Sequence, residues 1–494
     1  MDASSPGLDV PQGSSRSVAI RQIAAAEVGG RSREVPRSLK RLACVGTLGA
    51  ADLVIVHLAQ AFAAVALPAP AELVAIIPSA FFSVFAFLAA GLYTEWGMGP
   101  VERLRARGIG VALFSFAALL VLGAGERILT DVIVGQVALA AILIVPLGFY
   151  ASEAVRALLV RAGFWGVPTA LIGTGPHSIA LAHALLARPE YGLDIVGFID
   201  TDSEWDERRN PDLPLPVIGR SSEADRLSRR IRVVLVAARD PHASSDLLRL
   251  PFAHVVLAHW AANGPTSCLK LRSLCDGFGF DVPRGIFRRR NLLVKRCLDC
   301  SFGIPLLIIA SPVMLLIALA IKLASPGPVF FRQARTGMDG KVIEVLKFRT
   351  MYVDADARLK AHLASNAAAR AQWDAFFKLQ DDPRVIPRIG RLLRKYSLDE
   401  LPQLINVVLG HISLVGPRPF PAYHMQGFDE DFRRLRASVP PGLTGFWQIS
   451  ARSNGDLAVQ KAQDTYYIQN WSVWLDFYIL LRTPITVAAA RGAC

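Results

Sequence analysis

Four long apolar stretches occupy the first third of the chain and constrain its fold more than any other feature. They run over residues 42–67, 73–92, 109–122 with its flanks, and 132–160. Each can supply the roughly 20 residues that a helix needs to cross a bilayer. Charged residues make up only 19% of the chain, against about 25% in soluble domains. We therefore expect a membrane α-helical bundle of four transmembrane helices over residues 40–162.

Basic residues flank these stretches unevenly and predict their orientation. They precede the first stretch, separate the second from the third, and end the fourth: Arg37, Lys40, Arg41, Arg103, Arg105, Arg107, Arg156 and Arg161. The other two connections are nearly free of Lys and Arg. Because basic loops stay in the cytoplasm, both ends of the bundle are expected there. Residues 1–39 lack the apolar core of a signal peptide and are predicted to form a disordered cytoplasmic tail.

Short β-branched runs alternate with helix-like segments over residues 163–290, a pattern typical of a parallel α/β sheet. The turn Gly173-Thr174-Gly175 follows the first run, as in a dinucleotide-binding fingerprint, but Ser178 takes the place of the third glycine. Asp194 precedes its strand and Asp200 comes late, so neither is a clear ribose ligand. We predict a Rossmann-like cytoplasmic domain, whose glycine turn serves either a nucleotide or a scaffolding role.

A fifth apolar stretch, residues 298–323, has basic residues on both flanks. A helix that crossed the membrane here would carry one basic flank and the rest of the chain to the wrong side. Pro312 removes a backbone hydrogen bond and bends a helix, and the Ser311 hydroxyl could satisfy part of the broken ladder. We therefore predict a re-entrant helix that breaks at Pro312, with a kinked spanning helix as the alternative.

Two adjacent acids, Asp399 and Glu400, stand in the segment YSLDELPQL within a basic neighbourhood. Ser397 and Glu400 fit a capping box, or Asp399 caps the helix with Pro402 in its first turn. Capping does not explain the cations nearby: Lys347, Arg349, Arg388, Arg391, Arg394 and Arg418. Acids beside several cations also suit phosphoryl transfer, in which one carboxylate attacks phosphorus and the other holds a divalent metal. A basic face that docks on the membrane is the alternative.

Several long motifs occur in order over residues 326–453: GPVFFRQARTG, KFRTM, DDPRVIPRIGRLLRKYSLDELPQLINVVLGHISLVGPRP and PPGLTGFWQISARS. Together they resemble the bacterial sugar transferase family, the monotopic polyprenyl-phosphate hexose-1-phosphate transferases. The resemblance implies a mainly α monotopic catalytic domain over residues 291–494. The preceding helices and Rossmann-like domain are similar to those of long-form members, which include undecaprenyl-phosphate galactose and glucose phosphotransferases.

The resemblance also implies a role for each matching residue. Asp399 matches the nucleophile that attacks the sugar-bearing phosphate of a UDP-sugar and expels UMP. Glu400 matches its Mg²⁺-binding partner. The positions that match phosphate-binding residues or, more weakly, a C-terminal substrate region are Lys347, Arg394, Arg418, Arg452 and Asp464. Ser311 and Pro312 match the break of the re-entrant helix.

The resemblance further implies a UDP-hexose and undecaprenyl phosphate as substrates, with no nucleic acid partner. It implies a multi-pass protein of the bacterial inner membrane, surrounded by its lipids, with the catalytic domain on the cytoplasmic face and acting in exopolysaccharide, capsule or O-antigen synthesis. A homodimer is expected. The alternatives are a membrane-anchored NAD(P)-dependent nucleotide-sugar enzyme, for which no YxxxK pair follows in residues 169–290, and a transporter, for which the bundle has few ionisable residues besides Asp52 and His57.

Overall fold

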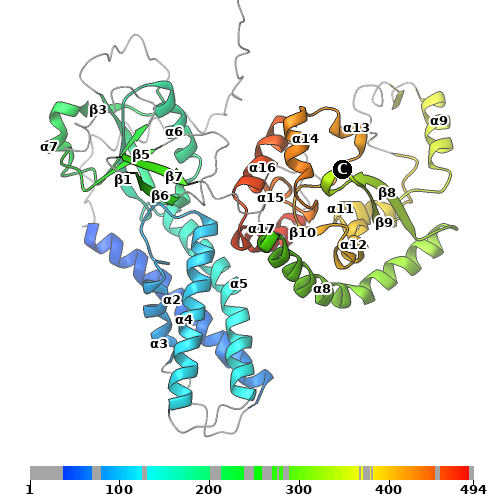
Figure 1. The fold of residues 1–494 in the computed structure, drawn as a ribbon, viewed down its shortest axis with the longest axis horizontal. Coiled ribbons are helices and arrows are strands. Elements are labelled where there is room, and N and C mark those ends of the chain that lie inside the picture. The colour runs from blue at the N-terminus through cyan, green and yellow to red at the C-terminus, as the bar shows by residue number, and fades with distance from the viewer. Residues whose placement is uncertain are drawn as a thin grey trace, which may run out of the picture. The chain divides into compact units, whose positions relative to one another are not determined.

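The chain divides into two compact units, Met1–Trp260 and Ala261–Cys494, each considered by itself below. The computed structural model describes residues 37–68, 79–124, 131–200, 213–237, 250–258, 270–274, 277–281, 289–366, 369–370, 379, 382–450 and 457–488. Most of the predicted N-terminal tail lies outside these residues, and the first described helix already begins at Arg37. Figure 1 shows the elements of both units.

The first unit begins with four helices: α2 (Arg37–Ala66), α3 (Ser79–Ala89), α4 (Pro100–Ala124) and α5 (Asp131–Arg161). Their shared core contains Leu48, Phe87, Phe114 and Ile144, one from each helix. Side chains on the outside are also apolar, such as Phe62 at 58% and Phe82 at 66% exposure. Apolar residues on both the inner and the outer surface are typical of helices in lipid.

Three helices in the described part of the chain are long and apolar enough to cross a membrane. They are Leu39–Ala66, Asp131–Arg161 and Arg290–Ala324. Two of the four predicted spans are therefore among them. The described part of α3 has only 11 residues, and α4 begins with a charged turn that contains Glu102, Arg103 and Arg105.

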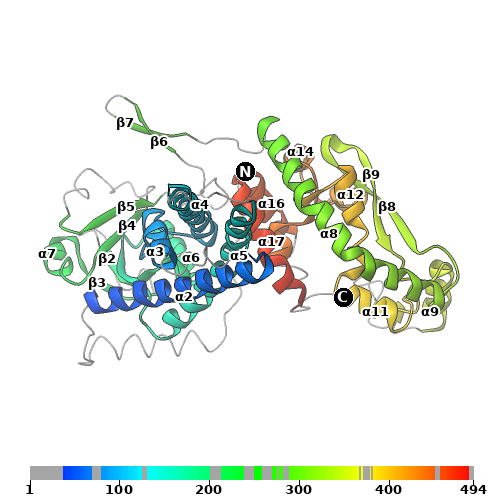
Figure 2. The same cartoon turned by 90° about the horizontal axis from the view of Figure 1, so that it is seen from below.

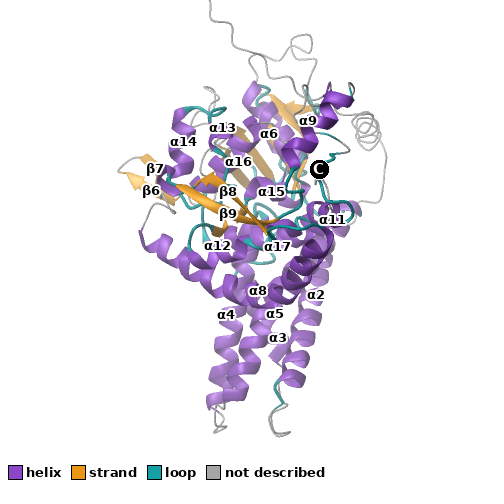
Figure 3. Cartoon of the chain, turned by 90° about the vertical axis from the view of Figure 1, so that its right-hand side faces the viewer, coloured by secondary structure: helices purple, strands orange, loops and turns teal. Residues whose placement is uncertain are grey.

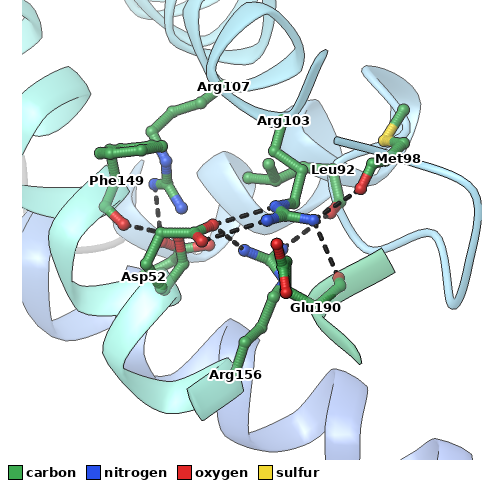
Figure 4. A network of polar contacts seen from close by, with 10 residues as sticks. Asp52, Leu92, Met98, Arg103, Arg107, Phe149, Arg156 and Glu190 are labelled. Atoms are coloured by element: carbon green, nitrogen blue, oxygen red, sulfur yellow. Dashed lines mark hydrogen bonds and ion pairs between the residues drawn. The ribbon is translucent and has the colours of Figure 1, made fainter. Parts of the chain in front are cut away.

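A buried ionic cluster joins the helices of the first unit (Figure 4). Arg107 of α4 lies 2.7 Å from Asp52 of α2, and both side chains are almost fully buried. The Tyr93 hydroxyl donates to the other Asp52 oxygen at 2.8 Å. Arg103 pairs with Glu153 of α5 at 2.9 Å. The expectation that Arg103 and Arg107 lie in a loop is thus wrong, because carboxylates on neighbouring helices allow both guanidinium groups to be buried.

The rest of the first unit is an α/β domain with the predicted parallel sheet. Its strands are β1 (Val167–Ile172), β2 (Leu193–Asp200), β3 (Val217–Arg220), β4 (Val233–Ala237) and β5 (His254–Ala258). They lie in the order β3-β2-β1-β4-β5, and all pairs are parallel. Dinucleotide-binding folds order their first five strands in the same way. Helices α6 (Pro176–Leu186) and α7 (Ala224–Leu227) follow β1 and β3.

The second unit contains a small β-hairpin, β6 (Lys270–Leu274) with β7 (Gly277–Asp281), and then the long helix α8 (Arg289–Ala324). A second hairpin follows, β8 (Phe330–Thr336) with β9 (Val342–Phe348). The remaining elements are α9 (Ala355–Ser365), α11 (Ile389–Lys395), α12 (Gln403–Leu409), β10 (Ser413–Val415), α13 (Ala422–Met425), α14 (Glu430–Ala437), β11 (Gly442–Thr444), α15 (Phe446–Ser450), α16 (Leu457–Gln469) and α17 (Val473–Ala488). Most of this unit is helical.

Helix α8 is bent but unbroken. Its helical structure continues through Pro312, where a break was expected, and Figure 1 shows it curving along its length. The Ser311 hydroxyl donates to the Ile308 carbonyl at 2.7 Å. Ile308 is four residues before Pro312, so its carbonyl is the one that the proline leaves without an N–H donor. The serine therefore supplies the missing donor, as the sequence predicted.

One face of α8 packs against the rest of the second unit, and the other is open. Met314 and Ile321 share a core with Phe348 of β9 and Leu393 of α11. On the opposite face Ile309, Leu315 and Leu323 are 72%, 72% and 79% exposed. Figure 2 shows α8 running along this unit beside α12 and α11. The open apolar face is long enough to require a covering by lipid or protein.

Candidate active site

Asp399 and Glu400 lie in a single 3₁₀ turn, Leu398–Glu400, between α11 and α12. The turn follows Ser397, whose φ of 55° places it in the left-handed region. No side chain caps this turn or α12, and α12 begins only at Gln403, after Pro402. Both capping predictions are therefore wrong. The backbone instead reverses at Ser397 and presents the two carboxylates together from a tight turn.

A buried polar side chain of α12 holds the helix against hairpin β8–β9. The Asn406 side chain is buried, accepts from the Leu346 backbone N–H at 2.9 Å and donates to the Glu344 carbonyl at 2.8 Å. These hydrogen bonds satisfy backbone groups on the edge of β9 that do not pair with β8. Arg296 of α8 donates to the Val407 and Val408 carbonyls at the other end of α12, both at 2.6 Å. The dyad is thus fixed between the hairpin and α8.

Two cations converge on Glu400. The Lys347 ammonium of β9 lies 2.7 Å from its Oε1. Arg418, from the loop after β10, contacts Oε1 at 2.7 Å and Oε2 at 3.4 Å. Asp399 is held less closely, because its nearest ion pair is with Lys347 at 3.8 Å. Both carboxylates are about 15% exposed. Glu400 is therefore locked in place while Asp399 remains available to a reacting group.

The surroundings shift the pKa values of the two carboxyls in opposite directions. Burial and the neighbouring Glu400 raise the pKa of Asp399, although Lys347 and Arg394 oppose the rise. Burial would also raise the pKa of Glu400, but Arg418 and Lys347 outweigh it and lower that pKa to about 2. Two neighbouring acids with separated pKa values commonly have separate chemical roles. Here Glu400 stays ionised, and Asp399 is the group that titrates.

Glu400, but not Asp399, lines an open cavity of about 240 Å³, which we call the dyad cavity. Glu400, Lys347 and Arg418 line it together with Gln403 and Arg335. Arg335 of β8 donates to the Pro419 carbonyl at 3.2 Å. Arg335 was not among the predicted site residues, although it stands in the motif GPVFFRQARTG. Its place in that motif, three residues after Arg332, is the signal that could have identified it.

The other predicted site residues have different positions. Arg394 of α11 donates to the Thr350 hydroxyl at 3.0 Å, and its charge acts on Asp399. Arg349 is buried and donates to the Ser325 and Pro326 carbonyls just after α8, so it points away from the dyad. Asp464 of α16 is buried 3.2 Å from Arg436. Burial raises the pKa of Asp464 to about 6, although Arg436 opposes the rise.

Arg452 lies outside the described residues. Ser311 and Pro312 lie in the bent middle of α8, where Ala310 and Met314 share a core with Leu398 and Leu401 on either side of the dyad. Among the described residues, no group of three or more His, Cys, Asp or Glu side chains could hold a metal by itself.

The glycine turn of the α/β domain has the form that its sequence suggests. Gly173 has a φ of 84°, and Gly175 caps α6. Ser178 is buried and donates to the Ile172 carbonyl at 3.2 Å, which ties α6 to β1. Asp200 is the last residue of β2, and Asp194 lies inside that strand. The prediction that Asp194 precedes its strand is therefore wrong, because β2 already begins at Leu193.

Comparison with known proteins gives a consistent result. The sequence profile described as bacterial sugar transferase matches residues 290–490. The chain is similar to the undecaprenyl-phosphate galactose phosphotransferase of Salmonella typhimurium, with 33% identity over 68% of this chain and 71% of that protein. It is 40% identical to exopolysaccharide production protein ExoY of Sinorhizobium fredii, over 45% of this chain and 97% of the relative.

A third relative is the UDP-glucose:undecaprenyl-phosphate glucose-1-phosphate transferase of Escherichia coli, with 41% identity over 39% of this chain and 40% of that protein. The motifs that carry the resemblance, from GPVFFRQARTG to PPGLTGFWQISARS, all lie inside the matched profile. They supply Lys347, Glu400 and Arg418, which line the dyad cavity, and Asp399, which lies 3.8 Å from Lys347. The chain belongs to the bacterial sugar transferase family.

Proposed function

We propose that this protein transfers a hexose-1-phosphate from a UDP-sugar to undecaprenyl phosphate and so begins the synthesis of an exopolysaccharide, capsule or O-antigen. The names of the relatives support both substrates. The observation that supports this chemistry is that the two acids differ in how closely cations pair with them. Glu400 is bound by two cations and lines an open cavity, whereas the adjacent Asp399 has only a 3.8 Å contact with Lys347.

In the first step, an Asp399 oxygen attacks the phosphorus that bears the sugar. A new carboxylate–phosphorus bond forms, the phosphorus–oxygen bond to UMP breaks, and UMP leaves with that electron pair. In the second step, an oxygen of undecaprenyl phosphate attacks the same phosphorus. The Asp399–phosphorus bond breaks, the carboxylate is regenerated, and the product is an undecaprenyl diphosphate sugar.

The cations around the dyad suit this chemistry because both substrates are anionic. Lys347, Arg394 and Arg418 surround the acids, and Arg335 lines the same cavity. Four cations near two carboxylates leave an excess of positive charge for phosphate oxygens. Preorganised cations stabilise the charge that develops on a transferring phosphoryl group. The arginine forks also orient the phosphate, which a point charge does not do.

Glu400 is the residue that we propose for Mg²⁺. Its Oε1 accepts from Lys347 and Arg418, while Oε2 has only the longer 3.4 Å contact with Arg418. Mg²⁺ in phosphoryl-transfer sites is usually held by one or two carboxylates together with substrate phosphates and water. A single protein carboxylate therefore fits this ion, which would neutralise negative charge on the diphosphate when bound.

We further propose that α8 is re-entrant and that the catalytic unit lies at the cytoplasmic face of the inner membrane. Residues along α8 from Leu307 to Ile321 pack against the catalytic elements. This packing extends along α8 for about 20 Å, since each residue advances about 1.5 Å, whereas a helix that crossed the bilayer would leave the catalytic elements over that length. A cysteine placed at exposed Arg332 tests this placement: labelling by an impermeant reagent from the periplasmic side would refute it.

We assign the α/β domain as Rossmann-like, on the strength of its strand order and its glycine turn. In this proposal it supports or regulates the transferase rather than performing the reaction.

The decisive experiment measures UMP release by the purified protein with Mg²⁺, undecaprenyl phosphate and a panel of UDP-sugars. Asp399→Asn should reduce release by at least about a thousandfold, because the amide cannot replace the nucleophile. Asp354→Asn is the matched control, because Asp354 is exposed and pairs only with Arg358. Normal turnover by Asp399→Asn would exclude the covalent mechanism, and no release with any UDP-sugar would exclude the proposed function.

A further inference from the structure

We propose that a second cavity, beside the dyad cavity, holds the nucleotide half of the donor and that Arg433 binds its phosphate. This inference rests on the proposed function. The cavity, here called the α14 cavity, lies between the end of β8, the loop after β10, and α14. The residues used in the argument are Thr336, Arg418, Phe420, Met425, Arg433 and Arg436.

The two cavities adjoin, because Arg418 and Pro419 line both. They measure about 240 Å³ and 310 Å³. A nucleoside diphosphate sugar is an extended ligand, so it would lie across both cavities, which share a wall. Arg418 would then lie at the diphosphate, between the sugar and the nucleoside.

The lining of each cavity indicates which half of the donor it takes. A hexose carries several hydroxyl groups, which need acceptors and donors close by. Gln403 in the dyad cavity can both donate and accept. The described lining of the α14 cavity has no carboxylate or carboxamide. Phe420 and Met425 provide apolar surface for a planar base, and Arg418 and Arg433 provide positive charge for the phosphate attached to it.

The position of the α14 cavity disfavours the lipid substrate. In Figures 1 and 3, α13 and α14 lie on the opposite side of hairpin β8–β9 and α12 from the apolar helix α8. A polyprenyl chain would approach from the membrane, along α8. The water-soluble donor would approach from the side of α14, whose outer face is charged.

The two arginines of α14 that line this cavity have different environments. Arg436 is buried, pairs with Asp464 at 3.2 Å, donates to the Arg418 carbonyl, and lies 4.3 Å from the centre of the Phe420 ring. It is therefore a positioning residue for the cavity wall. Arg433 is exposed at the cavity and has no side-chain partner among the described residues. An unpaired guanidinium at this point can bind the phosphate of the leaving nucleotide.

The test compares Arg433→Ala with Arg434→Ala in the full-length protein. Arg434 is a matched control, because it is adjacent, exposed and paired with Glu430, but it does not line the cavity. Arg433→Ala should raise both the KM for the UDP-sugar and the dissociation constant of UMP by about tenfold or more, as expected for the loss of one charge-assisted hydrogen bond. Arg433→Lys should restore part of the affinity. The KM for undecaprenyl phosphate should not change.

UMP binding is titrated directly, so the result does not depend on turnover. If UMP binds and Arg433→Ala weakens it, the inference holds even where no sugar is transferred, and only the proposed function fails. Unchanged UMP affinity in Arg433→Ala, or an equal loss in Arg434→Ala, would overturn the inference. So would a rise confined to the KM for undecaprenyl phosphate, which would assign the cavity to the lipid.

Discussion

Replacing Glu400 by Gln would test how the active site holds its charges. Burial alone would raise the pKa of Glu400 above its usual 4.5, but Arg418 and Lys347 lower it to about 2. A carboxyl whose pKa is lower in the folded than in the unfolded state stabilises the fold above the unfolded pKa. That stabilisation is lost as the pH falls towards the folded pKa. The relevant window therefore runs from pH 4.5 down to about 2.

The size of the effect follows from the two pKa values. A difference between 4.5 and about 2 corresponds to about 3 kcal/mol, at about 1.36 kcal/mol for each pKa unit. About 2 kcal/mol of this would already be lost at pH 3. The side chain is only 15% exposed, so solvent screening removes little of it. Glu400→Gln has no charge to titrate and should lack this part of the pH dependence.

The assay is chemical unfolding of the purified protein in detergent at pH 6 and pH 3. The wild type should lose about 2 kcal/mol more unfolding free energy between these pH values than Glu400→Gln. Glu344→Gln is the control: Glu344 is 64% exposed and pairs with Arg332, which is 71% exposed, so it should behave like the wild type. If Glu400→Gln shows the same pH dependence as the wild type, the pairing of Glu400 with two cations is refuted.

The same substitution should change the pH dependence of UMP release. Glu400 raises the pKa of Asp399, so its removal should lower that pKa and move the acid limb of the rate profile to lower pH. The maximal rate should fall, because the residue that we propose for Mg²⁺ is lost. An acid limb that moves to higher pH would contradict the assignment of Asp399 as the titrating group.

Two further predictions concern the scaffold. Arg107→Met should lower the unfolding free energy by about 3–5 kcal/mol, because it leaves Asp52 buried with one neutral partner, whereas adding Asp52→Leu should restore most of the loss. Thermal unfolding of the single and double variants measures both, and a double variant no more stable than the single would contradict the pairing. Asn406→Ala should cost about 2–4 kcal/mol by leaving the Leu346 N–H and the Glu344 carbonyl without partners. It should also slow UMP release, and an unchanged rate would show that α12 does not position the dyad.

Much of the architecture could be predicted from the sequence because it is recorded in local patterns. Apolar length identified the helices of the first unit and α8, and short β-branched runs identified the strands of the parallel sheet. The role of Ser311 beside Pro312 could be predicted because the serine and the carbonyl that it satisfies lie within one helical turn. Local patterns also placed Asp399 beside Glu400, and the surrounding motifs identified the family.

Local patterns could not predict where some helices begin or which partners the charged residues have. Arg103 and Arg107 were expected in a loop because their sequence is basic, yet they lie inside α4 beside carboxylates of other helices. Arg349 shares a motif with Lys347 but points to the end of α8. The partner of Asp464, buried Arg436, could not be predicted either. In each case the partner lies far away in the sequence.

The sequence by itself determined which residues this protein uses and which family it belongs to, since motifs and periodicity are properties of neighbouring positions. Only the tertiary structure decided what each charge does. Lys347 and Glu400 are 53 positions apart, and Arg418 lies 18 positions beyond Glu400. They meet because hairpin β8–β9 packs on α12 while the loop after β10 returns beside it. That meeting separates the pKa values of two adjacent acids, and no local pattern records it.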